Sequence, residues 1–180
     1  MVYCFLAEGF EELEAIAPVD MLRRAGIEVI TVGVTGKNVT GSHQITIAAD
    51  ITADELVLND ELEAVILPGG MPGTLNLEKD EKVQKAIDFA VSEGKYVCAI
   101  CAAPSILGHK GLLKGVKATA FPGFESDLEG AVIGNDFVCT DGKFITAKGA
   151  GVAVKFGLEI VARLVSEGKS KELEKTIQSE

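Results

Sequence analysis

The 180-residue sequence is 47% hydrophobic and 24% charged, with 20 glycines, which is typical of a globular protein and unlike a disordered one. Its formal net charge of -10 repels phosphate backbones and anionic lipid surfaces, so we expect neither nucleic acid nor a membrane as partner. The N-terminus has neither the basic region of a signal peptide nor an apolar run long enough to span a membrane, and we therefore expect a cytoplasmic protein.

The first half of the chain alternates strands with a helix. Residues 2–7 form an apolar run typical of a buried strand, and residues 11–26 predict a helix ended by a glycine. Residues 28–34 predict a second strand, and 44–50 predict a strand of alternating character. The fully apolar strand at 63–70 ends in a Pro-Gly-Gly turn, as expected of a buried parallel strand.

The second half continues this rhythm. Asp80 predicts the N-terminal cap of a helix over 80–95, and the apolar run 96–101 predicts the strand that follows. The other predicted elements are a helix at 103–113, a strand at 117–121, a hairpin at 136–147 and helices at 152–169 and 170–180.

No linker, repeat or low-complexity segment divides the sequence, so we expect a single α/β domain over 1–180. Its sheet is expected to be parallel or mixed and covered by helices on both faces. In such folds ligands bind at the carboxyl ends of strands, beside the point where the strand order reverses. The predicted strand ends at Ala7, Leu67 and Ile100 are therefore the places to look for chemistry.

Three of the four cysteines, Cys4, Cys98 and Cys139, lie within apolar runs typical of strands. This pattern favours buried free thiols over a disulfide framework. Cys101 differs, because it ends an apolar run and precedes a predicted helix.

Cys101 is the first candidate for chemistry. Pro104 fits the first turn of the following helix, so unpaired backbone N–H groups and the positive end of the helix dipole are expected to face the sulfur. Such a position lowers the pKa of a thiol, typically to within ~3.5–7.5. The alternative is that Cys101 is one more buried apolar residue. A redox pair with Cys98 is disfavoured, because residues three apart on a strand point to opposite faces.

Two further features can meet Cys101. The Gly69-Gly70 turn can bring backbone N–H groups close to an anion. Glu14 lies early in the predicted helix, at its inward edge, where a partly buried carboxyl can keep its proton, donate it in a hydrogen bond to a thiolate and act as general acid or base. The alternative for Glu14 is a solvated helix charge, like Glu11 and Glu12 beside it.

The two histidines, His43 and His109, belong to no group of residues with metal-ligand spacing in the sequence. His109 is expected to be a solvated residue at a helix end. We therefore expect no metal and no cofactor.

The segments GFEELEAIAPVDMLRRAGIEV, AVILPGGMPGTLNL and VCAICAAPSIL, with the AKGAG junction before the last long helix, resemble the Parkinsonism-associated deglycase branch of the ThiJ/PfpI superfamily. The resemblance runs from the first strand to the last long helix. It implies a flavodoxin-like, doubly wound, mostly parallel sheet and a homodimer. It also implies that Cys101 is the nucleophile, that Glu14 hydrogen-bonds it, and that the backbone amides of Gly70 and Ala102 stabilise an anion.

Departures from the family pattern bear on mechanism. Phe121 stands where human-type members have a histidine near the cysteine, so a proton shuttle through that histidine is missing. The peptidase-like branch has a histidine directly after its cysteine, and Ala102 in that place disfavours a Cys-His protease. His43 stands where human-type members have an arginine near the partner's site. We hypothesise that His43 reaches across the dimer to replace the lost basic group.

The sequence thus predicts cysteine-dependent processing of small α-oxoaldehydes or their protein adducts through a Cys101 hemithioacetal, as in a glutathione-independent glyoxalase or a deglycase. An alternative is a redox-sensing or chaperone-like stress protein in which Cys101 is oxidised to a sulfinate. A third possibility is a dimeric binding domain whose site is vestigial.

Overall fold

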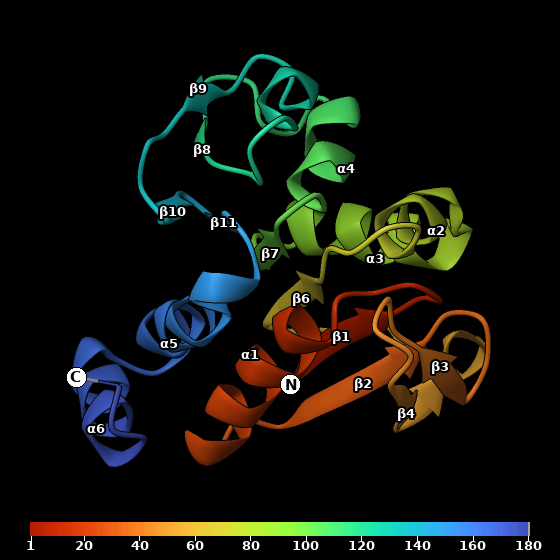
Figure 1. Cartoon of the computed structure of the whole chain (residues 1–180), viewed down its shortest axis with the longest axis horizontal. Coiled ribbons are helices and arrows are strands. Elements are labelled where there is room, and N and C mark those ends of the chain that lie inside the picture. The colour runs from red at the N-terminus through yellow and green to blue at the C-terminus, as the bar shows by residue number, and fades with distance from the viewer. Residues whose placement is uncertain (180) are drawn as a thin grey trace.

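Seven strands form the central sheet of the computed structural model, which describes residues 1–179 (Figure 1). Their order is β10-β11-β7-β6-β1-β2-β5, and every neighbouring pair is parallel except β10 and β11. This confirms the predicted mostly parallel, doubly wound sheet. The strands are β1 (Val2–Leu6), β2 (Val29–Gly33), β5 (Ile51–Thr52), β6 (Ala64–Leu67), β7 (Tyr96–Ile100), β10 (Val138–Asp141) and β11 (Phe144–Ala147).

Helices cover both faces of the sheet, as predicted (Figure 1). One face carries α1 (Glu12–Arg24), α5 (Ala153–Leu164) and α6 (Glu167–Thr176), and the other α2 (Gly73–Lys79), α3 (Glu81–Ser92) and α4 (Pro104–His109). Short 3-10 turns lie at Ala53–Glu55, Glu125–Asp127 and Ala150–Val152. Within residues 1–179, none of these helices is long and apolar enough to cross a bilayer.

The alternation of side chains along β7 divides the core into two hydrophobic clusters. Cys98 and Ile100 pack in the cluster that contains residues of α1 and α5, whereas Val97 and Ala99 pack with residues of α3 and α4. Both faces of the strand are therefore buried, which explains its continuous apolar run.

Two predicted strands lie outside the central sheet. The segment predicted at 44–50 contains β4 (Thr46–Ala48), which forms an antiparallel hairpin with β3 (Asn38–Thr40), and β5 instead pairs with β2. The segment predicted at 117–121 contains β8 (Lys117–Ala118), which pairs with β9 (Val132–Ile133) because β11 occupies the position beside β7. Both predictions of sheet strands were wrong in pairing, because only tertiary structure decides which strand a segment joins.

The helices differ from prediction at their ends. Asp80 caps α3 as predicted, with its Oδ1 accepting from the amides of Lys82 and Val83 at 2.9 and 3.1 Å. The predicted helix 103–113 ends at His109, before Gly111 with its φ of +70°. The seven-residue helix α2 was not predicted.

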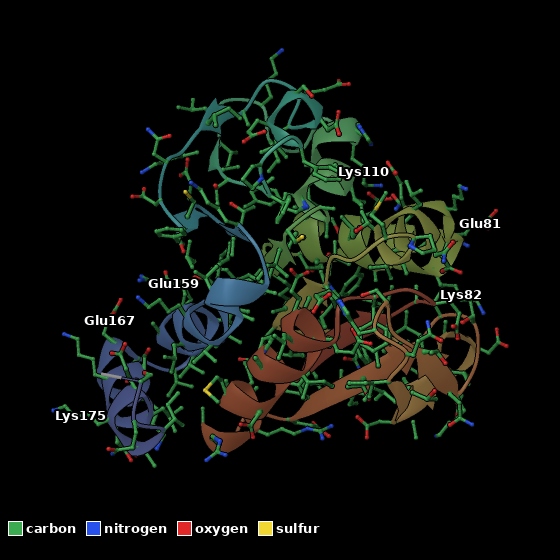
Figure 2. The ribbon with its side chains drawn as sticks, in the orientation of Figure 1. Glu81, Lys82, Lys110, Glu159, Glu167 and Lys175 are labelled. Carbon is green, nitrogen blue, oxygen red and sulfur yellow. The ribbon has the colours of Figure 1, made fainter. Side chains whose placement is uncertain are left out.

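The predicted helix 152–169 breaks at Ser166, which is extended and caps α6 by accepting from the amide of Lys169. The terminal helix therefore begins at Glu167 rather than at 170. Arg163 spans the break, donating to Glu159 at 2.8 Å and to Glu167 at 2.6 Å. Figure 2 labels both glutamates beside α5 and α6, and Glu159 also accepts from Thr140 of β10 at 2.6 Å.

The strand order places the crevice of the fold beside β1. This strand has β2 on one side and β6 on the other, so the order reverses there, and β7 follows directly after β6. The carboxyl ends of β1, β6 and β7 consequently meet at one edge of the sheet, where ligands bind in open α/β folds.

Candidate active site

Cys101 lies at a sharp turn directly after β7, three residues before α4 begins at Pro104. Its φ is +64°, a left-handed conformation that is strained for a residue with a side chain. Hydrogen bonds hold the turn: the amide of Cys101 donates to the carbonyl of Ala147 and its carbonyl accepts from the amide of Phe121, both at 2.9 Å. The neighbouring chain therefore fixes the conformation, which leaves the side chain partly exposed.

The turn also changes the side of the sheet on which Cys101 lies. Because its backbone leaves the extended conformation, Cys101 packs against the same hydrophobic cluster as Cys98, and the prediction of opposite faces was wrong. All four cysteines are nevertheless free, and Cys4, Cys98 and Cys139 are buried, as predicted.

Glu14 is the closest ionisable partner of Cys101. Its side chain lies in the first turn of α1, hydrogen-bonds the Cys101 side chain, and accepts from the amide of Gly69 at 2.9 Å and from that of Ala150. Only 1% of Glu14 is exposed, so it is not a solvated helix charge. The structure brings Glu14 and Cys101 together, while their predicted roles stay predictions.

Gly69 makes this contact possible. A Cβ at position 69 would lie 2.6 Å from the Cβ of Cys101 and 2.6 Å from Oε2 of Glu14. A side chain there would force the thiol and the carboxyl apart, so the turn after β6 has to carry glycine.

The backbone amides of Gly70 and Ala102 both hydrogen-bond the Cys101 sulfur. Gly70 has a φ of +88°, and a Cβ there would lie 2.4 Å from the nitrogen of Glu11. The β6 turn can therefore approach the sulfur only with glycine at this position. Two convergent N–H groups form a nest that suits a thiolate, a sulfinate or a carbonyl oxygen that gains charge.

The acid-base properties of the pair differ from the expectation for Cys101. Burial raises the pKa of the thiol to about 12, and the charge of Glu14 and its hydrogen bond add to this rise, against the lowering effect of the Ala102 and Gly70 amides. The predicted lowering of the thiol pKa was wrong, because burial of the thiol, together with the neighbouring Glu14 carboxylate, outweighs the two amides.

Burial also raises the pKa of Glu14 to about 7, although hydrogen bonds from Cys101 and Gly69 oppose the shift. The pair therefore gives up its first proton near pH 7. A thiol beside a carboxylate and a thiolate beside a carboxylic acid contain the same number of protons. Moving one proton along the hydrogen bond from Cys101 to Glu14 thus creates the nucleophile without any exchange with solvent.

His43 contacts the start of α1 in its own chain, through the loop between β3 and β4. Its Nδ1 lies 3.1 Å from Oε2 of Glu12, and its amide donates to Oε1 of Glu12 at 2.8 Å. Glu12 is only 7% exposed, so the expectation of a solvated charge was wrong for it. The predicted reach of His43 across a dimer stays a prediction.

Within residues 1–179, Glu11, Glu12 and His43 form the one group of side chains spaced closely enough for a metal ion. The prediction that His43 belongs to no metal-ligand cluster was wrong, because the β3–β4 hairpin folds onto α1. The carboxylate of Glu12 already accepts hydrogen bonds from the amides of His43 and Ile45, however. Its lone pairs therefore hold the β3–β4 loop in place. His109 pairs with Glu78 at 2.6 Å instead.

A pocket of about 310 Å³ lies near Glu14, because a Cβ on its lining residue Gly149 would be 3.8 Å from Oε1 of Glu14. The sequence did not predict this pocket. It lies between the Phe121-Pro122 segment and the Gly149–Val152 segment, with Phe137 at one side. The pocket could not be read from the sequence because its walls come from three separate segments. Phe121 and the AKGAG junction were the signals near it.

Comparison with known proteins places these features in context. Residues 1–163 match the DJ-1/PfpI family. Protein dj-1beta of Drosophila melanogaster is 34% identical over 173 residues, which make up 94% of this chain and 92% of that protein. A protein of Pyrococcus abyssi named a deglycase is 35% identical over 153 residues, 81% of this chain and 87% of that one. The structure of oxidized DJ-1 from Toxoplasma gondii has a TM-score of 0.91 and 30% identity, covering 98% of this chain and 97% of that chain.

Proposed function

The chain belongs to the DJ-1/PfpI family, and from that premise we propose that it uses Cys101 to process small α-oxoaldehydes or their protein adducts, as a glyoxalase or deglycase. The observation that carries this proposal is the hydrogen bond between the Glu14 carboxyl and the Cys101 thiol, beside the amides of Gly70 and Ala102. A relative named a deglycase supports it.

The reaction begins when the proton of the Cys101 thiol moves to the Glu14 carboxylate, which gives a thiolate beside a carboxylic acid. The sulfur attacks the aldehyde carbon, an S–C bond forms, and the π electrons of the carbonyl move to its oxygen. The amides of Gly70 and Ala102 stabilise that oxygen, and Glu14 donates the proton that completes the hemithioacetal.

Glu14, now a carboxylate, removes the hydrogen of the former aldehyde carbon, which leaves an enediolate on the two substrate carbons, and returns that proton to the neighbouring ketone carbon. The hydroxyl proton on the first carbon moves through Glu14 to the oxygen on the second. The first carbon is oxidised to a thioester and the second is reduced to an alcohol, so the step needs no external oxidant or reductant. Water hydrolyses the thioester, which releases a 2-hydroxy acid and restores Cys101. Phe121 offers no second base, so Glu14 carries these proton transfers alone.

Incubation of the purified protein with methylglyoxal tests the proposal. We expect lactate to form, at a modest rate, because one positioned acid or base is worth typically ~10²–10⁴-fold and no histidine stands at Phe121. The Cys101→Ser protein is the control. Lactate at the same rate with both proteins would reject the proposal.

A second candidate is a redox-responsive stress protein in which Cys101 becomes a sulfinate. Two equivalents of hydrogen peroxide would each transfer one oxygen to the sulfur and leave as water. The amides of Gly70 and Ala102 and a protonated Glu14 suit the two sulfinate oxygens, and a relative of known structure is described as oxidized. Intact-mass analysis after mild peroxide distinguishes the candidates: two added oxygens at Cys101 without aldehyde turnover favours the sensor.

We also propose a homodimer, formed through the apolar surface of Leu13, Ile16 and Ile45, which are 59%, 37% and 54% exposed. The hairpin and α1 present these side chains together, because the amide of Ile45 donates to Glu12. Sedimentation of wild type and Ile16→Asp tests this, and a monomeric wild type at micromolar concentration would contradict it.

The four free cysteines suit a reducing compartment, so we propose that the protein resides in the cytoplasm. Fractionation of its native cells tests this location. Recovery outside the cytoplasmic fraction would contradict it.

A further inference from the structure

The pocket beside the Cys101–Glu14 pair is largely apolar. Phe121 and Phe137 are 47% and 65% exposed, and with Pro122 and Val152 they supply most of its walls. Exposed aromatic rings that converge on a concave surface are typical of ligand sites.

Gly149 connects this pocket to the reactive pair. A Cβ at position 149 would lie 3.1 Å from Cδ2 of Phe121 and 3.8 Å from Oε1 of Glu14. The ring edge of Phe121 and the carboxyl of Glu14 therefore face the same space, which exists because residue 149 has no side chain. The hydrogen bond from the Phe121 amide to the Cys101 carbonyl fixes this wall to the Cys101 turn.

The charge around the pocket restricts what it can take. Lys148 is the single charged residue among those lining it, and its Nζ lies 5.3 Å from the ring centre of Phe137. A cationic group would meet like charge, and one of the two aromatic rings, Phe137, already faces the Lys148 ammonium. The modified side chains of lysine or arginine in a protein are therefore poor occupants, whereas a neutral apolar group is a good one.

The pocket volume of about 310 Å³ lies at the lower end of the range for small-molecule sites. It has room for one ring or a branched alkyl group and not for a peptide. Methylglyoxal would leave most of it unfilled.

We propose that this pocket receives the apolar group of a free α-oxoaldehyde bound to Cys101, and that Phe121 and Phe137 make the enzyme select aryl or branched-alkyl oxoaldehydes over methylglyoxal and over protein adducts. This inference rests on the proposed function. The first carbon of the substrate lies at the sulfur, and its ketone carbon points the attached group past Gly149 between the two rings.

Turnover measures the selectivity. We expect kcat/KM for phenylglyoxal to exceed that for methylglyoxal, after correction for reaction of each aldehyde with N-acetylcysteine, by about 10–200-fold. The double variant Phe121→Ala/Phe137→Ala should lose most of this ratio. Equal corrected values in the wild type, or a ratio that survives in the double variant, would overturn the proposal.

Alkylation of Cys101 by bromoketones tests this inference independently of the proposed function. Phenacyl bromide and bromoacetone each place on sulfur the carbon skeleton of the corresponding oxoaldehyde adduct, with bromide as leaving group. We expect Cys101 to prefer phenacyl bromide in the wild type and not in the double variant, again relative to N-acetylcysteine. A preference for phenacyl bromide without turnover of either aldehyde would reject the proposed function but support the proposed role of the pocket. If the wild type shows no such preference, the proposed role of the pocket is rejected.

Gly149→Ala tests the passage itself. Its Cβ would narrow the space between Phe121 and Glu14, so the preference for phenacyl bromide should fall while alkylation by bromoacetone changes less. Gly168→Ala in α6 is the matched control, because it lies outside the pocket and a Cβ there meets only Oγ of Ser166, at 3.8 Å. A preference that Gly149→Ala leaves intact would contradict the route.

A second copy of the chain could instead fill the pocket. In that case the wild type should show no phenacyl preference, and the Ile16→Asp protein should gain it on becoming monomeric. This outcome would overturn the proposal and assign the pocket to the dimer.

Discussion

Two carboxylates in the first turn of α1 are both shielded from solvent, yet they titrate in opposite directions. Burial raises the pKa of Glu12, but hydrogen bonds from His43 and Ile45 outweigh it, and the net pKa is lowered. Burial raises the pKa of Glu14 to about 7, because fewer donors meet its oxygens. Glu12 thus stays ionised and holds the β3–β4 loop, whereas Glu14 can carry a proton at neutral pH.

The difference teaches that burial alone does not make a carboxyl a proton carrier. What matters is whether the surrounding structure satisfies the charged form. The N–H donors of the β3–β4 hairpin are committed to Glu12, and the amides of Gly70 and Ala102 are committed to the Cys101 sulfur. The same turn of helix therefore has one structural and one chemical carboxylate.

The largest expected effect is the difference in turnover between the Glu14→Gln and Glu12→Gln proteins. We expect Glu14→Gln to lower turnover of an oxoaldehyde by roughly 10²–10⁴-fold, because glutamine cannot transfer the proton. Glu12→Gln should keep turnover near the wild-type value. Steady-state kinetics of the two variants measure this, and equal losses in both would remove the distinction between the two sites.

The same variants should differ in the pH dependence of stability. The folded-state pKa of Glu14 is raised to about 7, so its contribution to the free energy of unfolding is fully present below its unfolded pKa and is lost as pH rises to about 7. This contribution is on the order of 3 kcal/mol in total. Glu12, with its lowered pKa, contributes above its unfolded pKa and loses this contribution as pH falls through its folded pKa.

Urea unfolding of wild type, Glu14→Gln and Glu12→Gln between pH 3 and 8 measures these contributions as differences from the wild type. The other titrating groups, including His43 and Cys101, are common to the three proteins. A Glu14 contribution that grows with rising pH would show that its carboxyl is stabilised as the anion, like Glu12.

Gly69→Ala should disrupt the chemical site while sparing the Glu12 contacts. The added Cβ would overlap Cys101 and Glu14, and overpacking of this kind costs typically ~1–3 kcal/mol. We expect lower stability in urea and loss of the thiol–carboxyl hydrogen bond, seen as a changed pH profile for alkylation of Cys101. Gly168→Ala, whose Cβ would meet only Oγ of Ser166 at 3.8 Å and which lies away from the site, is the control.

His43→Ala should give the smallest effect. If His43 replaces the missing base across a dimer, turnover falls modestly while the pH profile of Cys101 alkylation in the same chain is unchanged. Sedimentation shows whether the variant is still dimeric. A dimeric variant with unchanged turnover would confine His43 to its contact with Glu12.

Local sequence signals predicted much of the fold. Apolar runs marked β1, β2, β6 and β7, and Asp80 marked the start of α3, because strand burial and helix capping act over a few neighbouring residues. The segments at 44–50 and 117–121 were assigned to the wrong sheet, since strand pairing depends on which edge is free. The break at Ser166 was missed because the apolar periodicity runs across it.

The candidate site was likewise predicted only in part. The residues Cys101, Glu14, Gly70 and Ala102 were identified from the turn after β7, the Pro-Gly-Gly motif and the family resemblance. The hydrogen bonds between Glu12 and the hairpin and the pocket at Phe121 were not identified. Each of these joins segments that are distant in the sequence and have no local pattern in common.

The sequence by itself determined that a cysteine directly follows one strand and that a carboxyl lies early in the helix after another, because the order of strands and helices brings the carboxyl ends of parallel strands together. Only the tertiary structure decided the charge of these groups. A pKa depends on the donors, charges and solvent within a few ångströms, and for Cys101 and Glu14 those neighbours come from β6, the Ala150 turn and each other.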